Sequence, residues 1–276
     1  MKTMTMGGKA ASVLGQGTWY VGDVTAKRPA EVATLRCGVE LGMTVVDTAE
    51  MYGSGRAESV VGEAIRGLRE RVYLVSKVLP SNASREGTVR ACEASLKRLG
   101  TDVLDLYLLH WRGRYKLAET VSAFELLQKQ GKIRAWGVSN FDVDDMEELF
   151  RVPGGDKCAA NQVLYNPEHR GIEWDLLPWC RERGVRVMAY SPLGQAVELL
   201  ESRALGTVAQ KHAATAAQVA LAWALRQGVV AIPKASSVEH VEENARGAEL
   251  ELDAEDLVGI EREYPAPVRK MTLDVL

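Results

Sequence analysis

The sequence predicts an α/β protein that folds as a single-domain (β/α)8 barrel covering residues 1–276. Strand-like and helix-like segments alternate along almost the whole chain, which predicts a parallel sheet with crossover helices. The repeat length is about thirty residues, as a barrel of eight such units requires. No linker rich in proline, serine or glycine and no low-complexity tract divides the chain, which favours one domain over two.

The expected strands are short runs of apolar and β-branched residues bounded by turn-forming residues. They cover residues 12–16, 43–46, 72–76, 103–109, 133–138, 159–162, 185–189 and 229–232. Between them lie segments with apolar residues at helical spacing, such as Val32, Leu35 and Val39 in the first expected helix, which Gly42 ends. The later helices are expected at residues 58–68, 84–99, 118–130, 142–150, 175–183 and 213–227.

A doubly wound sheet is the alternative α/β design, and it uses a glycine-rich phosphate-binding loop after a strand. Gly15 and Gly17 supply two glycines of a GxGxxG pattern, but Tyr20 stands where the third is required. The chain also lacks the GxxxxGK[ST] loop. The barrel is therefore the favoured design.

Composition restricts the class of function. The 276 residues carry a formal net charge of -3, which argues against nucleic acid or an anionic membrane as the main partner. The N-terminal residues lack the apolar core of a signal peptide, and no apolar run reaches membrane-spanning length. The four cysteines form no CxxC pair, which is typical of reduced, packed thiols. We expect a cytoplasmic protein that binds neither nucleic acid nor membranes.

Reactive side chains stand at the ends of three expected strands. Asp47, Lys77 and His110 each follow an apolar strand, and Tyr52 lies in the glycine-containing loop after Asp47. Each has an ordinary structural alternative: a turn cap for Asp47, a rim aromatic for Tyr52, a snorkelling amine for Lys77 and a core histidine for His110. Because the strands of a parallel barrel share one direction, all four are expected on one rim, which favours a catalytic site.

These four residues can together deliver a proton to a carbonyl oxygen. A phenol with a pKa of about 10 is a weak acid at neutral pH, and we expect the Lys77 ammonium to lower the pKa of Tyr52. Asp47 is expected to keep Lys77 charged and in place. His110 can donate a hydrogen bond that orients the substrate oxygen. None of these side chains supplies a hydride, so carbonyl reduction requires a nicotinamide cofactor.

Two other chemistries fit the sequence less well. A glycoside-hydrolase-type barrel needs two acids on the rim, but only Asp47 is clearly there, since Glu50 lies within its loop. A metal site is not expected, because the chain has no HExxH motif and its four histidines are scattered.

Seven segments, in order along nearly the whole chain, resemble motifs of the aldo-keto reductase superfamily. They are VVDTAEMYGSG, YLVSKV, LDLYLLHW, GVSNF, NQVLYNP, AYSPLG and AIPKASSVEHVEEN. The chain looks most similar to bacterial members that reduce small aldehydes and dicarbonyls, of the methylglyoxal and diketogluconate types. The resemblance implies a monomeric NADPH-dependent reductase with Tyr52 as general acid, Lys77 and Asp47 as its tuning pair and His110 as the carbonyl orienter. A nicotinamide-sensing regulatory subunit on the same fold is the alternative.

The resemblance also implies a cofactor groove. In it, Ser139, Asn140 and Gln162 hold the nicotinamide amide, and Tyr190 stacks on the nicotinamide ring. Further residues implied along the cofactor are Thr18, Trp19, Asp47, Ser191, Leu193, Gly194, Lys234, Ala235, Ser236, Ser237, His240, Glu243 and Asn244.

Two positions at the adenosine end depart from the family pattern. Ala235 stands where the family often has serine, and His240 where it often has arginine. Lys234, Ser236 and Ser237 are expected around the 2′-phosphate of NADPH. Because imidazole lacks the charged, bidentate fork of arginine, we expect NADPH to be preferred by a smaller margin, with NADH as the weaker alternative.

Aromatic residues are expected to wall the substrate pocket around Tyr52 and His110. They are Trp19, Tyr20 and Trp111. The arginines of the loop 112–114 can either attract acidic substrates or simply be solvated, and solvation is the commoner role of exposed charge. The tail 265–276 is short, so we expect an open pocket.

Overall fold

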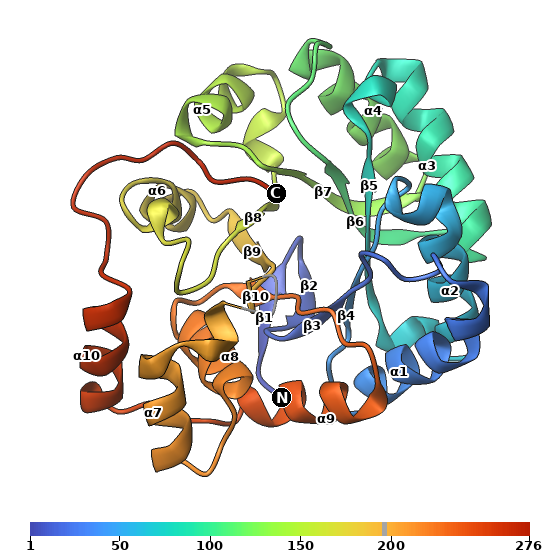
Figure 1. Ribbon diagram of the computed structural model, residues 1–276. Coiled ribbons are helices and arrows are strands. Elements are labelled where there is room, and N and C mark those ends of the chain that lie inside the picture. The colour runs from blue at the N-terminus through green and yellow to red at the C-terminus, as the bar shows by residue number, and fades with distance from the viewer. Residues whose placement is uncertain (195–197) are drawn as a thin grey trace.

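The computed structural model describes residues 1–194 and 198–276, and within these ranges eight parallel strands form a barrel (Figure 1). The strands are β3 (Gly15–Gly17), β4 (Val45–Asp47), β5 (Tyr73–Val78), β6 (Leu104–Leu109), β7 (Ile133–Ser139), β8 (Ala160–Leu164), β9 (Arg186–Tyr190) and β10 (Val230–Ala231). They pair in chain order from β3 to β10. A parallel bridge between Leu14 and Ala231 joins the two ends of the sheet. The predicted fold class is confirmed.

Helices surround the barrel strands (Figure 1). They are α1 (Arg28–Glu40), α2 (Arg56–Ala64), α3 (Arg85–Leu99), α4 (Leu117–Lys129), α5 (Val143–Arg151), α6 (Leu176–Glu182), α7 (Arg203–Lys211), α8 (Ala216–Arg226), α9 (Val238–Gly247) and α10 (Ala254–Glu263). Local signals set their ends: the Ser84 side chain accepts a hydrogen bond from the Gly87 N–H at the start of α3, and Gly100 ends that helix in the left-handed conformation. Within the described ranges, no helix combines the length and apolar character needed to cross a membrane.

Helix α8 begins later than the sequence predicts. The expected start was residue 213, but Ala213 has a φ of 49°, which a right-handed helix excludes. Thr215 instead caps the helix by accepting a hydrogen bond from Gln218 N–H. The alanine-rich composition predicts the helix interior, whereas the capping residue decides its first turn.

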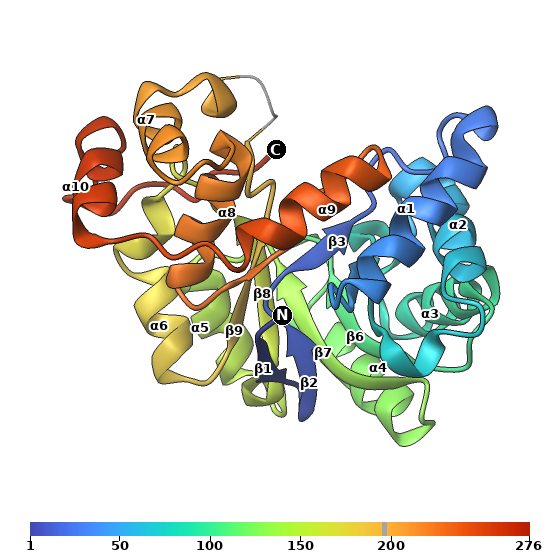
Figure 2. The same cartoon turned by 90° about the horizontal axis from the view of Figure 1, so that it is seen from below.

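An antiparallel hairpin closes one end of the barrel. Strands β1 (Thr3–Met6) and β2 (Lys9–Ser12) pair around a turn at Gly7 and Gly8, which both have positive φ. Met6 packs with the side chains inside the barrel, and its carbonyl accepts a hydrogen bond from the Tyr73 hydroxyl. Figure 2 shows the hairpin at the opposite end of the barrel from the C-terminus.

The hairpin corrects the prediction for the first strand. Residues 12–16 were expected to form one strand, but Ser12 ends the hairpin and the barrel strand begins at Gly15. The Gly-Gly pair is a recognised hairpin signal. Helices α7, α9 and α10 are likewise absent from the prediction.

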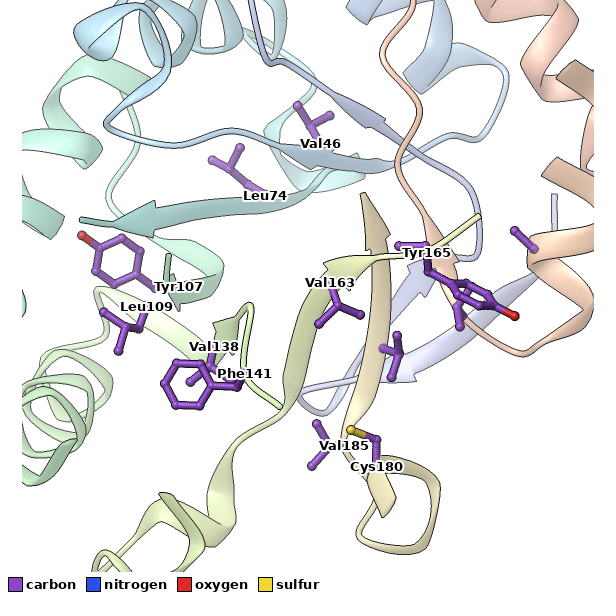
Figure 3. Close-up of a cluster of buried hydrophobic side chains, with 14 of the residues drawn as sticks. Val46, Leu74, Tyr107, Leu109, Val138, Phe141, Val163, Tyr165, Cys180 and Val185 are labelled. Carbon is purple, nitrogen blue, oxygen red and sulfur yellow. The ribbon is translucent and has the colours of Figure 1, made fainter. Parts of the chain in front are cut away.

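Apolar side chains form two layers separated by the sheet. The outer layer lies between strands and helices, and Figure 3 shows Val46, Leu74, Tyr107 and Val163 among its members. The inner layer fills the barrel. Along a strand, alternate residues belong to alternate layers, as the two-residue period of a β-strand requires.

This alternation places the reactive side chains on the interior face of the barrel. Val45 belongs to the inner layer, and Asp47 follows two residues later. Val75 precedes Lys77 in the same way, and Leu108 precedes His110. Each polar side chain therefore continues the interior-facing row of its strand, at the end where the apolar layer stops.

Candidate active site

A cavity of about 400 Å³ opens at the end of the barrel where Asp47, Lys77 and His110 terminate their strands. Its walls come from the ends of most barrel strands and the loops after them. The lining residues are Gly17, Thr18, Trp19, Tyr20, Asp47, Met51, Tyr52, His110, Trp111, Ser139, Asn140, Gln162, Tyr190, Ser191, Pro192, Leu193, Gly194, Ile232, Pro233, Lys234, Ser236 and Leu276. Active sites of (β/α)8 barrels form at this end of the strands.

A chain of short polar contacts underlies the cavity floor. Lys77 is completely buried, and its Nζ atom lies 2.6 Å from Asp47 Oδ2 and 3.1 Å from the Tyr52 hydroxyl oxygen. Lys77 also donates to the Thr48 carbonyl at 3.0 Å. All three donor positions of the ammonium are thus used. The structure brings Asp47, Lys77 and Tyr52 together, as the sequence predicts.

The pKa of Tyr52 differs in direction from the expectation. Burial raises the pKa of the Tyr52 phenol above its ordinary value, and the Lys77 ammonium only partly offsets this. The expected net lowering of the Tyr52 pKa is therefore wrong for the protein without ligand. Burial by itself would lower the pKa of Lys77, but the Asp47 and Tyr52 oxygens outweigh burial and raise it. At neutral pH the phenol keeps its proton and the amine stays charged.

His110 lines the same cavity as Tyr52. The two rings meet edge to face with centroids 5.7 Å apart. Burial, aided by the Lys77 charge, lowers the pKa of His110 to about 3, so the imidazole is neutral at physiological pH. Its Nδ1 atom is buried and has no hydrogen-bond partner within the described residues. In the neutral tautomer that carries its proton on Nε2, the Nδ1 atom is an acceptor. The unpaired atom of His110 is then an acceptor and not a donor.

Amide and hydroxyl groups gather beside the catalytic candidates. Gln162 donates from Nε2 to Asp47 Oδ1 at 2.8 Å, and Ser139 donates to the Gln162 backbone carbonyl at 2.8 Å. Asn140, whose φ is 58°, donates to the His110 carbonyl and accepts from the Tyr190 hydroxyl at 3.0 Å. This set offers amide donors and acceptors next to an aromatic ring, which suits a planar carboxamide-bearing heterocycle.

The cavity wall also carries a cation. Lys234 is exposed, and its Nζ atom donates to the Ser236 hydroxyl at 2.9 Å. Thr18 lines the cavity too, with its hydroxyl bonded to the Asp47 carbonyl. Backbone turns at Ser191 and Gly194 complete this wall, both with positive φ.

Several expected adenosine-end residues do not line the cavity. Ser237 caps α9, Glu243 accepts from the Thr215 hydroxyl, and Asn244 is buried in the same helix. Ala235 packs in an apolar cluster near α9, and His240 is exposed on that helix. Their resemblance-based roles remain predictions.

Aromatic residues form part of the cavity wall. Trp19 and Tyr20 stack with centroids 4.7 Å apart, and Trp111 packs against His110. Arg112 does not line the cavity, because it pairs with Glu148 at 3.0 Å. This ion pair holds Arg112 against α5.

The C-terminal tail reaches the cavity, and the expected open pocket stays a prediction. Leu276 lines it and donates from its backbone N–H to the Tyr190 hydroxyl at 3.4 Å. Lys270 holds the tail to Asp175 at 2.7 Å. No local sequence pattern predicts that the C-terminal tail returns to the cavity.

The sequence analysis also did not identify Met51, which lines the cavity, or Asn166, which donates to the Ser191 carbonyl at 2.9 Å.

The described residues contain no cluster of three or more His, Cys, Asp or Glu side chains able to hold a metal ion.

Comparison with known proteins agrees with this geometry. The model of the aldo/keto reductase family matches residues 13–263. Methylglyoxal reductase YeaE of Escherichia coli (strain K12) is 55% identical over 268 residues, which cover 95% of this chain and 94% of that protein. Glyoxal reductase of Bacillus subtilis (strain 168) is 40% identical over 227 residues, covering 81% and 80%.

A solved structure extends the similarity to three dimensions. The aldo/keto reductase of Klebsiella pneumoniae, determined in complex with NADP and acetate, superimposes with a TM-score of 0.98 and is 52% identical. The match covers 100% of this chain and 99% of that one. With its barrel, its Asp-Lys-Tyr chain and more than half of the aligned residues identical in two of these relatives, this protein belongs to the aldo/keto reductase family.

Proposed function

We propose that this protein is an NADPH-dependent reductase of small aldehydes and dicarbonyls, with methylglyoxal as a representative substrate. The observation that carries the proposal is the hydrogen-bonded chain from Asp47 through Lys77 to Tyr52, which faces the same cavity as His110. Similarity to methylglyoxal reductase YeaE and to glyoxal reductase supports the substrate class.

The cavity fits a nicotinamide cofactor chemically. Gln162, Ser139 and Asn140 offer amide-binding groups, Tyr190 offers a flat aromatic face, and Lys234 offers a positive charge in the same lining. When bound, NADPH supplies the hydride that reduces the carbonyl carbon. The neighbour from Klebsiella pneumoniae was determined with NADP, which supports the same cofactor here.

The side chains of this chain supply the proton. Tyr52 donates its hydroxyl proton to the carbonyl oxygen of the substrate, and the raised pKa of the phenol ensures that the proton is present at neutral pH. Lys77 stabilises the phenolate left behind, since its Nζ atom is already 3.1 Å away. Neutral His110 donates to the substrate oxygen and orients it.

An NADPH-oxidation assay tests the proposal. The purified protein is mixed with NADPH and, one at a time, methylglyoxal, glyoxal, a simple aldehyde and an aldose. We expect loss of NADPH absorbance with the dicarbonyls and formation of the corresponding alcohol. Tight NADPH binding without turnover of any carbonyl would instead indicate the nicotinamide-sensing alternative, which the complete Asp47-Tyr52-Lys77-His110 set argues against.

A further inference from the structure

Gln162 makes a contact that cofactor binding alone does not require. Its Nε2 atom donates a 2.8 Å hydrogen bond to Asp47 Oδ1, and both side chains are buried. The other carboxylate oxygen, Oδ2, accepts from Lys77. Asp47 is therefore held at both oxygens, by a cation on one side and by a neutral amide on the other.

Loss of the Gln162–Asp47 hydrogen bond would affect the titratable groups around Asp47. The titratable groups that face it are Lys77 from β5 and Tyr52 from the loop after β4, and His110, which follows β6, packs edge to face against Tyr52. A buried carboxylate that loses one of its two partners is free to rotate about its terminal torsion, which is broad for aspartate. Rotation would weaken the Oδ2 contact with Lys77, and Lys77 in turn contacts Tyr52.

Gln162 also lines the cavity. Its Nε2 atom is directed to protein partners, Asp47 and, at 3.9 Å, the Met188 sulfur. The Oε1 atom of the same planar amide is then the group available to a ligand N–H. Because one rigid amide joins both contacts, a ligand that fixes Oε1 also fixes the donor to Asp47.

We propose that Gln162 is a positioning residue that couples the seating of the nicotinamide amide to the alignment of Asp47, and through Lys77 to proton delivery by Tyr52. This inference rests on the proposed reductase function. It differs from a role in cofactor affinity alone, because it requires an effect that persists when the cofactor is saturating.

Gln162→Met tests the coupling, since methionine has similar length and burial but no N–H donor. At saturating NADPH we expect kcat for methylglyoxal to fall about 10- to 100-fold, the range for a lost hydrogen bond to a buried charge. We also expect the alkaline limb of the kcat–pH profile to move to lower pH, because a less firmly held Lys77 releases its proton more readily. Gln162→Asn is one methylene shorter and keeps the site polar. It should also lower kcat and move the alkaline limb to lower pH.

Ser139→Ala is the matched comparison. Ser139 lines the same end of the cavity, but its hydroxyl contacts the Gln162 backbone and not Asp47. We expect it to weaken NADPH binding, measured by fluorescence titration, without moving the alkaline limb. Thermal unfolding establishes that each variant is folded.

The results distinguish failure of the proposed reductase function from failure of the Gln162–Asp47 coupling. If the wild-type protein reduces no carbonyl, the proposed function fails. If the wild-type protein is active but both Gln162 variants keep the wild-type kcat and alkaline limb at saturating NADPH, or move the limb to higher pH, the coupling is overturned and Gln162 acts in binding alone.

Discussion

The Lys77 ammonium donates a hydrogen bond to the Tyr52 hydroxyl over 3.1 Å, while its nitrogen also lies 4.7 Å from the centroid of the same ring. The cation therefore approaches the phenol at its oxygen and over its π-face. Both contacts depend on Lys77 being charged, and Asp47 maintains that charge at 2.6 Å.

Removing the Tyr52 hydroxyl should separate chemistry from binding. We expect Tyr52→Phe to lower kcat for methylglyoxal by roughly 10²- to 10⁴-fold, the contribution of a positioned proton donor. NADPH affinity, followed by protein fluorescence, should be retained. Tyr115→Phe is the control, because Tyr115 does not line the cavity. A Tyr52→Phe protein that works at the wild-type rate would remove Tyr52 from the mechanism.

The Asp47–Lys77 pair should show strong coupling in stability. Lys77→Met leaves the Asp47 carboxylate buried without its cation, and breaking such a pair costs about 3–5 kcal/mol. The double variant Asp47→Asn/Lys77→Met removes both charges, so we expect it to unfold at a higher urea concentration than Lys77→Met. It should remain inactive. Equal or lower stability of the double variant would show that the charge imbalance is not the cause.

His110 should make the protein sensitive to acid. Burial lowers its pKa to about 3 in the folded state, against about 6.5 in the unfolded chain. Between these values the unfolded state binds the extra proton, so the stability from neutral His110 is complete above pH 6.5 and is lost as pH falls toward 3. His110→Asn cannot titrate, and its urea midpoint should fall less than that of the wild-type protein from pH 7 to pH 4. Parallel pH dependences would contradict this.

Cofactor preference should depend on Lys234 and position 240. Lys234→Ala removes the exposed cation beside Ser236 and should reduce the NADPH-to-NADH ratio of kcat/KM by ~10-fold. His240→Arg should raise the ratio, because arginine offers the bidentate fork that imidazole lacks. Steady-state kinetics with both cofactors measure the ratio. A wild-type preference for NADH would refute the expectation.

Local patterning was enough to predict the fold class and to place the candidate catalytic side chains at one end of the barrel. The β-strand period places Asp47, Lys77 and His110 on the interior row, and the common direction of parallel strands places them at one end of the barrel. Both properties are encoded within short stretches of chain. The helix end at Gly100 and the cap at Ser84 are encoded in the same local way.

Other features came only from contacts between distant segments. The Gln162–Asp47 bond joins residues 115 positions apart, and the return of Leu276 to the cavity depends on Lys270 meeting Asp175. The raised pKa of Tyr52 is also tertiary, because the burial that outweighs Lys77 is supplied by the assembled barrel. Sequence alone determined which chemical groups stand at the strand ends, because that information is local. Packing decided which of them touch and in what protonation state, because desolvation and long-range contacts exist only once the chain has folded.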